Sequence, residues 1–443
     1  MPILEALVIC VLLLSVTVPT WAAVFGFISL LVLAAYMLAG VFGPSPNYDI
    51  VGRDQLPSNT SDAFLSLLQS LVDAAVNRTG GFEVLTNGPA FYPAELDAIR
   101  SAQHSVSLEA YIFHRSEIGK LYLDALTDRA RAGIPVNVVL DSFGSAGIGK
   151  RYFRPLLDAG GKVAFYNSPT WYRLLQLDNR THRELLIVDG RIGFIGGAGI
   201  ADQWFKGIGK NPRWRDTMLR VEGGAVPNLQ ATFAENWLSA TGELLAGNAY
   251  FPEISCPDST AALVVNSTPT IGGSTRARVL FQLLLASAKH SISITTPYFL
   301  PDKSLSRELC RAIEERHVKI RVLVPGRKSD HLLTRSTSRG AYGPLLKSGA
   351  EVYEYQPAMI HAKVLVVDNV WTVVGSTNFD NRSFGLNDEV NLAVRDESLA
   401  QRMEADLTND LLQSRRVTLD EWRHRPITER APELLGWIFE RQQ

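Results

Sequence analysis

Hydrophobic positions divide the chain into a continuous apolar N-terminus and a body of short alternating segments. From Ala6 to Gly43 no residue is charged, and Leu, Val, Ile and Ala are frequent. A helix that crosses a bilayer needs about 20 apolar residues, so this run is long enough for nearly two crossings. We therefore predict a transmembrane anchor over residues 1–43, formed by two helices that turn at Pro19 and Thr20.

Two alternatives to this anchor remain open. A single crossing is the first, because the first apolar segment is short and carries Glu5. A cleavable signal peptide is the second, but such a peptide has a positive n-region and a shorter apolar core. The first basic residue of this chain is Arg53, which favours an anchor. No Lys or Arg cluster flanks the run, so its orientation is not indicated.

The segments next to the anchor and at the C-terminus have simpler patterns. Residues 44–60 are rich in Pro, Gly, Asn and Asp, which is typical of a linker. A helix is predicted from about Asp62 to Val76, so residues 44–79 form a linker and a helix. Residues 432–443 predict an amphipathic helix that either packs on the core or docks on a membrane surface.

The body of the chain repeats itself. Residues 99–113 align without gaps with residues 285–299, and each segment reads as a helix end, a polar turn and an alternating strand. A helical stretch and further apolar strands follow in both copies. Strands that alternate with helices predict βαβ units and a mostly parallel sheet. The predicted fold class is α/β, with two similar halves, residues 80–257 and 258–443, packed face to face.

Charge and cysteine content exclude several classes of protein. The formal net charge is -1, which gives no electrostatic reason to expect a nucleic-acid partner. The three cysteines, Cys10, Cys256 and Cys310, lie far apart and form no pattern of metal ligands or disulfides. Phosphate-loop, nucleophile-elbow and zinc-protease motifs are also missing from the sequence.

The second copy contains the clearest chemical motif, HAKVLVVD, at residues 361–368. Alternation along a strand places His361 and Lys363 on one face. A turn after Asp368 and a return strand bring Ser376 and Asn378 back beside them. An imidazole, an ammonium, a hydroxyl and an amide together suit a phosphate group, so we predict a phosphate site here.

The first copy repeats this motif with two changes. His182 and Asp189 keep their places, and Gly197 lies where the second copy has its serine. Glu184 replaces the lysine and Gly199 replaces the asparagine, while alternation points the neighbouring Arg183 side chain to the opposite face.

A carboxylate for each imidazole lies further along the same copy: Asp216 in the first and Glu389 in the second. Such a carboxylate fixes the tautomer of the ring and stabilises an imidazolium. A single histidine on a strand is more often structural than catalytic. Two histidines at equivalent positions of a repeat, each followed by an aspartate and a glycine-rich turn, favour catalysis.

These motifs resemble the phospholipase D superfamily, in which H-x-K-x-x-x-x-D precedes G-S-x-N. The longer string VVGSTNFDNRSFGLNDEVNL, with ITTPYFLPD upstream, resembles bacterial cardiolipin synthases. The resemblance implies two phospholipase D-like halves around a pseudo-two-fold axis, preceded by the anchor in the bacterial inner membrane. It also implies that one histidine, by precedent His182, attacks phosphorus and forms a phosphohistidine, while His361 protonates the leaving alkoxide. No metal or other cofactor is implied.

The resemblance implies phospholipid substrates, with phosphatidylglycerol as donor and a second lipid's headgroup as acceptor. Water as acceptor would make the protein a phospholipase. A nuclease is disfavoured by the charge and the anchor, and the oligomeric state is not indicated.

Glu184 leaves three interpretations open. The side chain holds a proton and donates a hydrogen bond, or a nearby cation compensates for it, or the protein is a weakened or non-catalytic lipid-binding homologue. The candidate cations are Lys206, Lys210, Arg213 and Arg215. An ionised Glu184 would repel the substrate by about 4 kcal/mol at 4 Å and an effective dielectric of 20.

Overall fold

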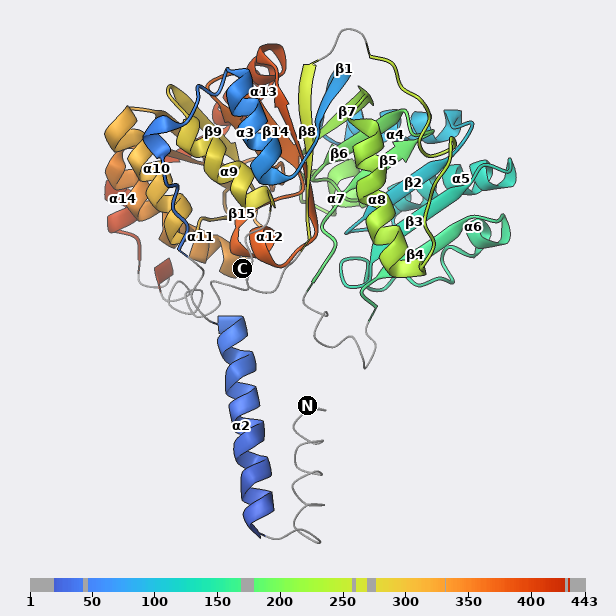
Figure 1. The fold of residues 1–443 in the computed structure, drawn as a ribbon, viewed down its shortest axis with the longest axis horizontal. Helices are drawn as coiled ribbons and strands as arrows, with labels where there is room; N and C mark the ends of the chain where they lie inside the picture. The colour runs from blue at the N-terminus through green and yellow to red at the C-terminus, as the bar shows by residue number, and fades with distance from the viewer. Residues whose placement is uncertain are drawn as a thin grey trace.

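A computed structural model describes residues 20–42, 47–168, 179–256, 260–268, 276–330, 332–426 and 429–430. The first of the two predicted N-terminal helices and the predicted C-terminal helix lie outside these residues. Figure 1 shows a two-part body from which one helix, α2 (Thr20–Phe42), extends away.

The described strands form one large mixed sheet that runs through both halves. Its strands number 15, in the order β17-β12-β11-β9-β13-β14-β16-β8-β1-β7-β6-β5-β2-β3-β4. In the first half they are β1 (Val76–Thr86), β2 (Val106–Ala110), β3 (Val136–Asp141), β4 (Lys162–Tyr166), β5 (Leu185–Val188), β6 (Ile192–Gly196) and β7 (Thr217–Gly223). In the second half they are β8 (Thr260–Ser267), β9 (Ser291–Thr295), β11 (Lys319–Pro325), β12 (Glu351–Tyr355), β13 (Val364–Val367), β14 (Trp371–Gly375), β16 (Glu389–Arg395) and β17 (Ser414–Val417). A separate two-stranded sheet joins β10 (Phe299–Leu300) to β15 (Phe379–Asp380).

The strand order confirms the internal duplication. Counted outward from the middle of the sheet, β1-β7-β6-β5-β2-β3-β4 matches β8-β16-β14-β13-β9-β11-β12 strand for strand. Strands β1 and β8 pair antiparallel and make the sheet continuous between the halves. Strands β6 and β7 also pack against β14 of the other half. The α/β fold with two repeated parts is therefore as predicted.

The prediction of a mostly parallel sheet is wrong. Only the outer strands, β2-β3-β4 and β9-β11-β12, pair in parallel, and the inner strands are antiparallel. The reason is the tight hairpin after each histidine motif. Asp189 and Gly190 have φ of 55° and 62°, and Asp368 and Asn369 have φ of 54° and 55°. Two consecutive left-handed residues make the short turn that joins antiparallel strands.

Helices cover both faces of the sheet. The central core joins strands of both halves to α8 (Val226–Thr241) and α13 (Glu397–Leu411), and it includes Phe233, Trp237 and Met403. The outer face of the first half carries α4 (Gly88–Ser101), α5 (Glu117–Arg131), α6 (Arg154–Asp158) and α7 (Asp202–Phe205). The second half carries α3 (Asp62–Val72), α9 (Arg276–Ser287), α10 (Lys303–Arg316) and α11 (Leu332–Ser348) on its outer face. The short helices α12 (Asn381–Gly385) and α14 (Leu419–Arg423) complete this half.

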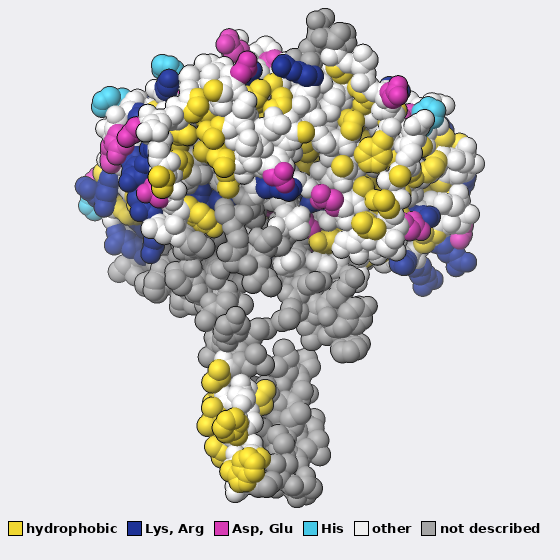
Figure 2. All heavy atoms as spheres, in the orientation of Figure 1, with side chains coloured by type: hydrophobic (Ala, Val, Ile, Leu, Met, Phe, Trp, Pro, Cys, Tyr) yellow, Lys and Arg dark blue, Asp and Glu magenta, His cyan; other side chains and the backbone are white. Residues whose placement is uncertain are grey.

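Helix α2 exposes apolar side chains along its described part. Trp21, Phe25 and Val32 are 74%, 73% and 63% exposed, and Figure 2 shows this stretch without charged side chains. Side chains of α2 are described for residues 20–22 and 24–32. Across the described residues, no helix meets the length and apolarity required of a membrane span. The predicted transmembrane anchor is therefore not confirmed.

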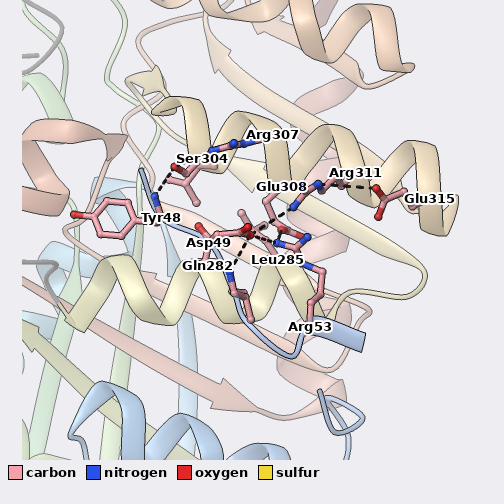
Figure 3. A network of polar contacts seen from close by, with 12 residues as sticks. Tyr48, Asp49, Arg53, Gln282, Leu285, Ser304, Arg307, Glu308, Arg311 and Glu315 are labelled. Carbon is pink, nitrogen blue, oxygen red and sulfur yellow. Dashed lines mark hydrogen bonds and ion pairs between the residues drawn. The ribbon is translucent and has the colours of Figure 1, made fainter. Parts of the chain in front are cut away.

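Part of the predicted linker is packed against the second half. We call residues 47–56 the strap. Its Tyr48 backbone N–H donates to Ser304 Oγ at 2.9 Å, and the Tyr48 ring lies 4.5 Å from the Arg278 guanidinium. Arg53 pairs with the buried Glu308 at 2.8 Å and with Asp49 at 3.0 Å. Figure 3 shows the strap lying across α9 and α10.

We predict that Arg53→Ala loosens the strap. Glu308 would keep only Arg316, at 3.2 Å, as a cationic partner. Removal of one partner of a buried charged group costs about 1–3 kcal/mol. Denaturant unfolding should show this loss, and limited proteolysis should cut residues 47–60 faster. The control is Arg100→Ala, whose pair with Asp97 is exposed and should contribute less than about 1 kcal/mol. Equal effects of the two substitutions would contradict the prediction.

Candidate active site

A cavity of about 390 Å³ lies where the two halves meet. Its walls contain both motif histidines, which the sequence places 179 residues apart, as 361 − 182. Glu184 and Gly197 line it from the first half, and Lys363 and Asn378 from the second. The two histidine motifs therefore face a single space.

Backbone contacts hold the first histidine against the second half. Thr181 and Asp388 form a parallel β-bridge. The His182 N–H donates to the Asp388 carbonyl at 2.8 Å, and the Asp388 N–H donates to the Arg180 carbonyl at 2.8 Å. His182 precedes β5 rather than lying within it.

The equivalent contact in the other copy holds the second histidine against the first half. Ile360 bridges Arg215, and the His361 N–H donates to the Arg215 carbonyl at 2.7 Å. Each histidine is thus attached to the residue that precedes a carboxylate of the opposite half. These reciprocal bridges are the pattern that a pseudo-two-fold axis produces.

The carboxylates pair with the histidines across the halves. His361 Nδ1 lies 3.0 Å from Asp216 Oδ2, and His182 Nδ1 lies 3.3 Å from Glu389 Oε1. Both carboxylates are fully buried. The sequence analysis matched each carboxylate with the histidine of its own copy, and that pairing is wrong. Both copies carry a carboxylate at this place, so the sequence could not reveal the exchange.

His361 and Lys363 form the more strongly charged side of the cavity. Lys363 Nζ lies 2.7 Å from His361 Nδ1 and 3.1 Å from Nε2. If Nδ1 donates to Asp216, the ammonium can donate only to Nε2, so the imidazole is neutral. Burial lowers the pKa of His361, and the nearby Lys363 charge lowers it further. Burial also lowers the pKa of Lys363.

Asp216 keeps its charge in this setting. Burial alone would raise its pKa, but the hydrogen bond from His361 and the charge of Lys363 hold the pKa below its usual value. Asp216 also accepts a 2.9 Å hydrogen bond from Trp204 Nε1. It is therefore a permanent negative partner for the His361 ring.

Aromatic rings enclose both imidazoles, and the sequence analysis did not identify them. Trp204 and Trp214 have ring centroids 5.2 Å and 5.5 Å from that of His361. The Tyr111 ring lies 4.7 Å from the His182 ring, edge to face. No motif marks these aromatic residues, because they come from different elements and meet only in the folded chain.

The three predicted phosphate-binding positions have different surroundings. Asn378 lines the cavity, and its buried Oδ1 has no hydrogen-bond partner among the described residues. Gly197 also lines it, and a Cβ there would lie 2.7 Å from Lys363 Cδ. Ser376 is not part of the cavity wall. Its hydroxyl donates to Glu389 Oε2 and accepts from the Val390 N–H, so it positions the carboxylate that faces His182.

The motif aspartates lie at the other end of the hairpins and hold backbone groups. Asp189 accepts from the N–H groups of residues 103–105 at 2.7–3.1 Å. Asp368 accepts from the N–H groups of residues 289–291 and from Asn59 Nδ2. Neither aspartate lines the cavity. These contacts favour a structural role over the catalytic role that the sequence suggested, because His361 and Asp368 lie seven residue steps apart, about 23 Å in extended chain.

The two altered positions of the first copy lie together at the cavity. Glu184 Oε1 accepts from the N–H groups of Tyr111 at 3.2 Å and Ile112 at 3.4 Å. Gly199 touches the same place, since a Cβ there would lie 3.2 Å from Glu184 Oε1 and 2.8 Å from the Ile112 carbonyl oxygen.

None of the cations that the sequence suggested as compensation for Glu184 lines the cavity. Lys206 pairs with Glu117 and Asp202, and Arg215 pairs with Asp410 at 2.9 Å. The cavity instead contains Arg180 of the first half and Arg382 of the second. Sequence reasoning missed both, although Arg382 lies within the quoted string that includes Asn378.

Comparison with known proteins agrees with this duplicated site. A family described as "Cardiolipin synthase, PLD-like domain" matches twice, over residues 96–226 and 282–411. Cardiolipin synthase 1 of Bacillus anthracis is 34% identical over 361 residues, which cover 79% of this chain and 70% of that protein. The major cardiolipin synthase ClsA of Bacillus subtilis is 34% identical over 372 residues, which cover 83% and 76%.

A solved structure gives the same picture of the fold. Phosphatidylserine synthase of Haemophilus influenzae superposes with a TM-score of 0.64, covering 84% of this chain and 98% of that one, at 15% identity. That likeness concerns the fold alone. The family match and the sequence relatives show that the chain belongs to the phospholipase D-like family that contains the bacterial cardiolipin synthases. The protein is therefore a phospholipase D-family transphosphatidylase.

We predict that the motif aspartates stabilise the fold without taking part in turnover. Asp189→Asn and Asp368→Asn keep a side chain that tolerates the left-handed turn but remove the charge that attracts several N–H groups. Each should lower the free energy of unfolding by about 1–2 kcal/mol and leave the activity per folded molecule within about threefold. The matched control is Asp216→Asn, which should abolish most activity. If Asp368→Asn were as inactive as Asp216→Asn at unchanged stability, the structural role would be wrong.

Proposed function

We propose that the protein is a membrane-bound phosphatidyl transferase that makes cardiolipin from phosphatidylglycerol. The observation that carries the proposal is the convergence of His182 and His361, from opposite halves, on one cavity that also contains an ammonium and two guanidinium groups. Cationic side chains stabilise a phosphodiester and the charge that develops on it. The named relatives are cardiolipin synthases, and this supports phospholipids as substrates.

The proposed reaction has two displacements at one phosphorus atom. In the first, His182 Nε2 attacks phosphorus, and the bond from phosphorus to the glycerol oxygen of the donor breaks. His361, as imidazolium, gives its proton to that oxygen, so glycerol leaves and a phosphohistidine remains. In the second, the acceptor hydroxyl gives its proton to His361 and attacks phosphorus, which frees His182 and yields cardiolipin.

The state of His361 fits this role once substrate is bound. In the empty cavity, burial and Lys363 lower its pKa. An anionic phosphodiester placed beside the ring favours the protonated forms of both His361 and Lys363. Asp216 then balances the imidazolium at 3.0 Å. Glu389, oriented by Ser376, holds the His182 ring from the opposite side of the junction.

We further propose that α2 associates with the bacterial inner membrane and keeps the site near its lipids. The exposed Trp21, Phe25 and Phe27 side chains suit a lipid environment better than water. The strap then connects this helix to the second half through Tyr48 and Arg53.

The test is to incubate the purified full-length protein with headgroup-labelled and acyl-labelled phosphatidylglycerol in detergent micelles. We expect cardiolipin and free glycerol in equal amounts. His182→Ala and His361→Ala should each lower the rate by at least about a thousandfold, because each removes an essential group. Phosphatidic acid as the main product would make water the acceptor and the protein a phospholipase. No turnover by the folded wild type would favour a non-catalytic lipid-binding protein.

A further inference from the structure

Glu184 stands where the second copy carries an ammonium group, and it lines the cavity beside His182. We propose that Glu184 works as a neutral carboxylic acid that donates a hydrogen bond to a non-bridging oxygen of the bound phosphodiester. The proposal deepens the proposed function, since it rests on a phosphodiester occupying this cavity. It would make the two sides of the site chemically different: an ammonium on one side and a neutral donor on the other.

The orientation of the carboxyl group supports a donor. Both described hydrogen bonds of Glu184 end at Oε1, which accepts from the backbone N–H groups of Tyr111 and Ile112. These N–H groups can only donate, so Oε1 is an acceptor and a proton on Glu184 would sit on Oε2. No described residue forms a hydrogen bond with Oε2, which leaves this oxygen, with its proton, for a ligand.

The two departures from the family pattern fit each other. A Cβ at Gly199 would lie 2.8 Å from Ile112 Cβ and 3.2 Å from Glu184 Oε1. A side chain at position 199 would therefore displace the backbone that holds Glu184. In the second copy, Asn378 takes the matching position and reaches the cavity itself. Each copy thus has its own compatible pair of residues at these two positions: glutamate with glycine in the first copy, and lysine with asparagine in the second.

The surroundings favour the protonated form. Burial raises the pKa of Glu184 well above its ordinary value, and Glu95 acts in the same direction. The N–H group of Ile112, the Lys363 ammonium and the N–H group of Tyr111 act against it without outweighing burial. The charge of Glu184 also acts on the side chains of Tyr92, Tyr111 and Tyr122. The other charged or imidazole side chains that share the cavity with Glu184 and Lys363 are Arg180, His182, Asp330, His361, Asp380 and Arg382. A neutral acid avoids the repulsion that a carboxylate would exert on a phosphodiester.

The decisive comparison is wild type against Glu184→Gln, Glu184→Ala and Glu184→Lys, assayed for transfer from labelled phosphatidylglycerol. A glutamine amide has the same shape, with one oxygen for the backbone N–H groups and an N–H group for the phosphate. We expect Glu184→Gln to stay within about tenfold of wild type at neutral pH. Glu184→Ala should lose about tenfold to a hundredfold, the effect of removing one hydrogen bond to a charged group.

The pH profile separates a donor from a structural group. Because the folded pKa of Glu184 is raised, its donor form extends to higher pH than that of an ordinary glutamate and is lost as pH rises through that pKa. Wild-type activity should therefore fall on the alkaline side at a lower pH than that of Glu184→Gln, which has no proton to lose. The matched control is Glu95→Gln. Glu95 is a buried carboxyl with a pKa of about 8 that lies outside the cavity wall, and its charge raises the pKa of Glu184. This variant should therefore keep an alkaline limb but move it to lower pH, whereas Glu184→Gln should lose the limb that Glu184 causes.

Three results would overturn the inference. If Glu184→Gln were as inactive as Glu184→Ala while melting at the wild-type temperature, the carboxylate would be acting as a base. A large gain in Glu184→Lys would mean that the glutamate only mismatches the charge. Coincident pH profiles of wild type and Glu184→Gln would exclude a titrating donor. Absence of transfer by the wild type itself would instead count against the proposed function.

Discussion

The site depends on an exchange of partners between the two halves. Asp216 of the first half faces His361 of the second, and Glu389 of the second faces His182 of the first. Both carboxylates are fully buried, and a buried charge without its partner is strongly unfavourable. Neither half can therefore form its own part of the site alone. Assembly of the halves and assembly of the site are one event, which the continuous pairing of β1 with β8 supports.

The duplication gives the two halves the same backbone arrangement, but their side chains give the two histidines different charged and hydrogen-bonded surroundings. On one side Lys363 lies within 3.1 Å of both ring nitrogens of His361, and Trp204 donates to Asp216. On the other side Ser376 holds Glu389, and no ammonium lies within the first motif. The two displacements proposed for this site need a nucleophile and an acid at the same time. An asymmetric charge distribution can keep the two imidazoles in different protonation states.

Sequence reasoning found the residues that periodicity and repetition mark. The equivalent positions of His182 and His361 indicated one shared cavity, and the hairpin after His361 placed Asn378 beside Lys363. Sequence reasoning could not identify partners that come together only in the folded chain. Asp368 looked catalytic because it belongs to the motif, but a strand carries it to the far end of the hairpin, where it binds Asn59 and three backbone N–H groups.

The strap and the exchanged carboxylates eluded sequence reasoning for the same reason. Residues 47–56 have the composition of a linker, but Tyr48 and Arg53 contact groups more than 200 positions away, which composition cannot indicate.

The contacts of the strap limit the movement of the body relative to α2. Six peptide steps separate Phe42 from Tyr48, and a fully extended chain of that length spans at most about 22 Å. If α2 lies in a bilayer, as proposed, this short tether keeps the strap and the second half close to the lipid surface. The reach of the tether is comparable to the thickness of one headgroup layer plus the radius of a small domain. On that proposal, a lipid phosphate would need to leave the bilayer only partly to reach the cavity, and the ion pair of Arg53 with Glu308 would serve substrate access as well as stability.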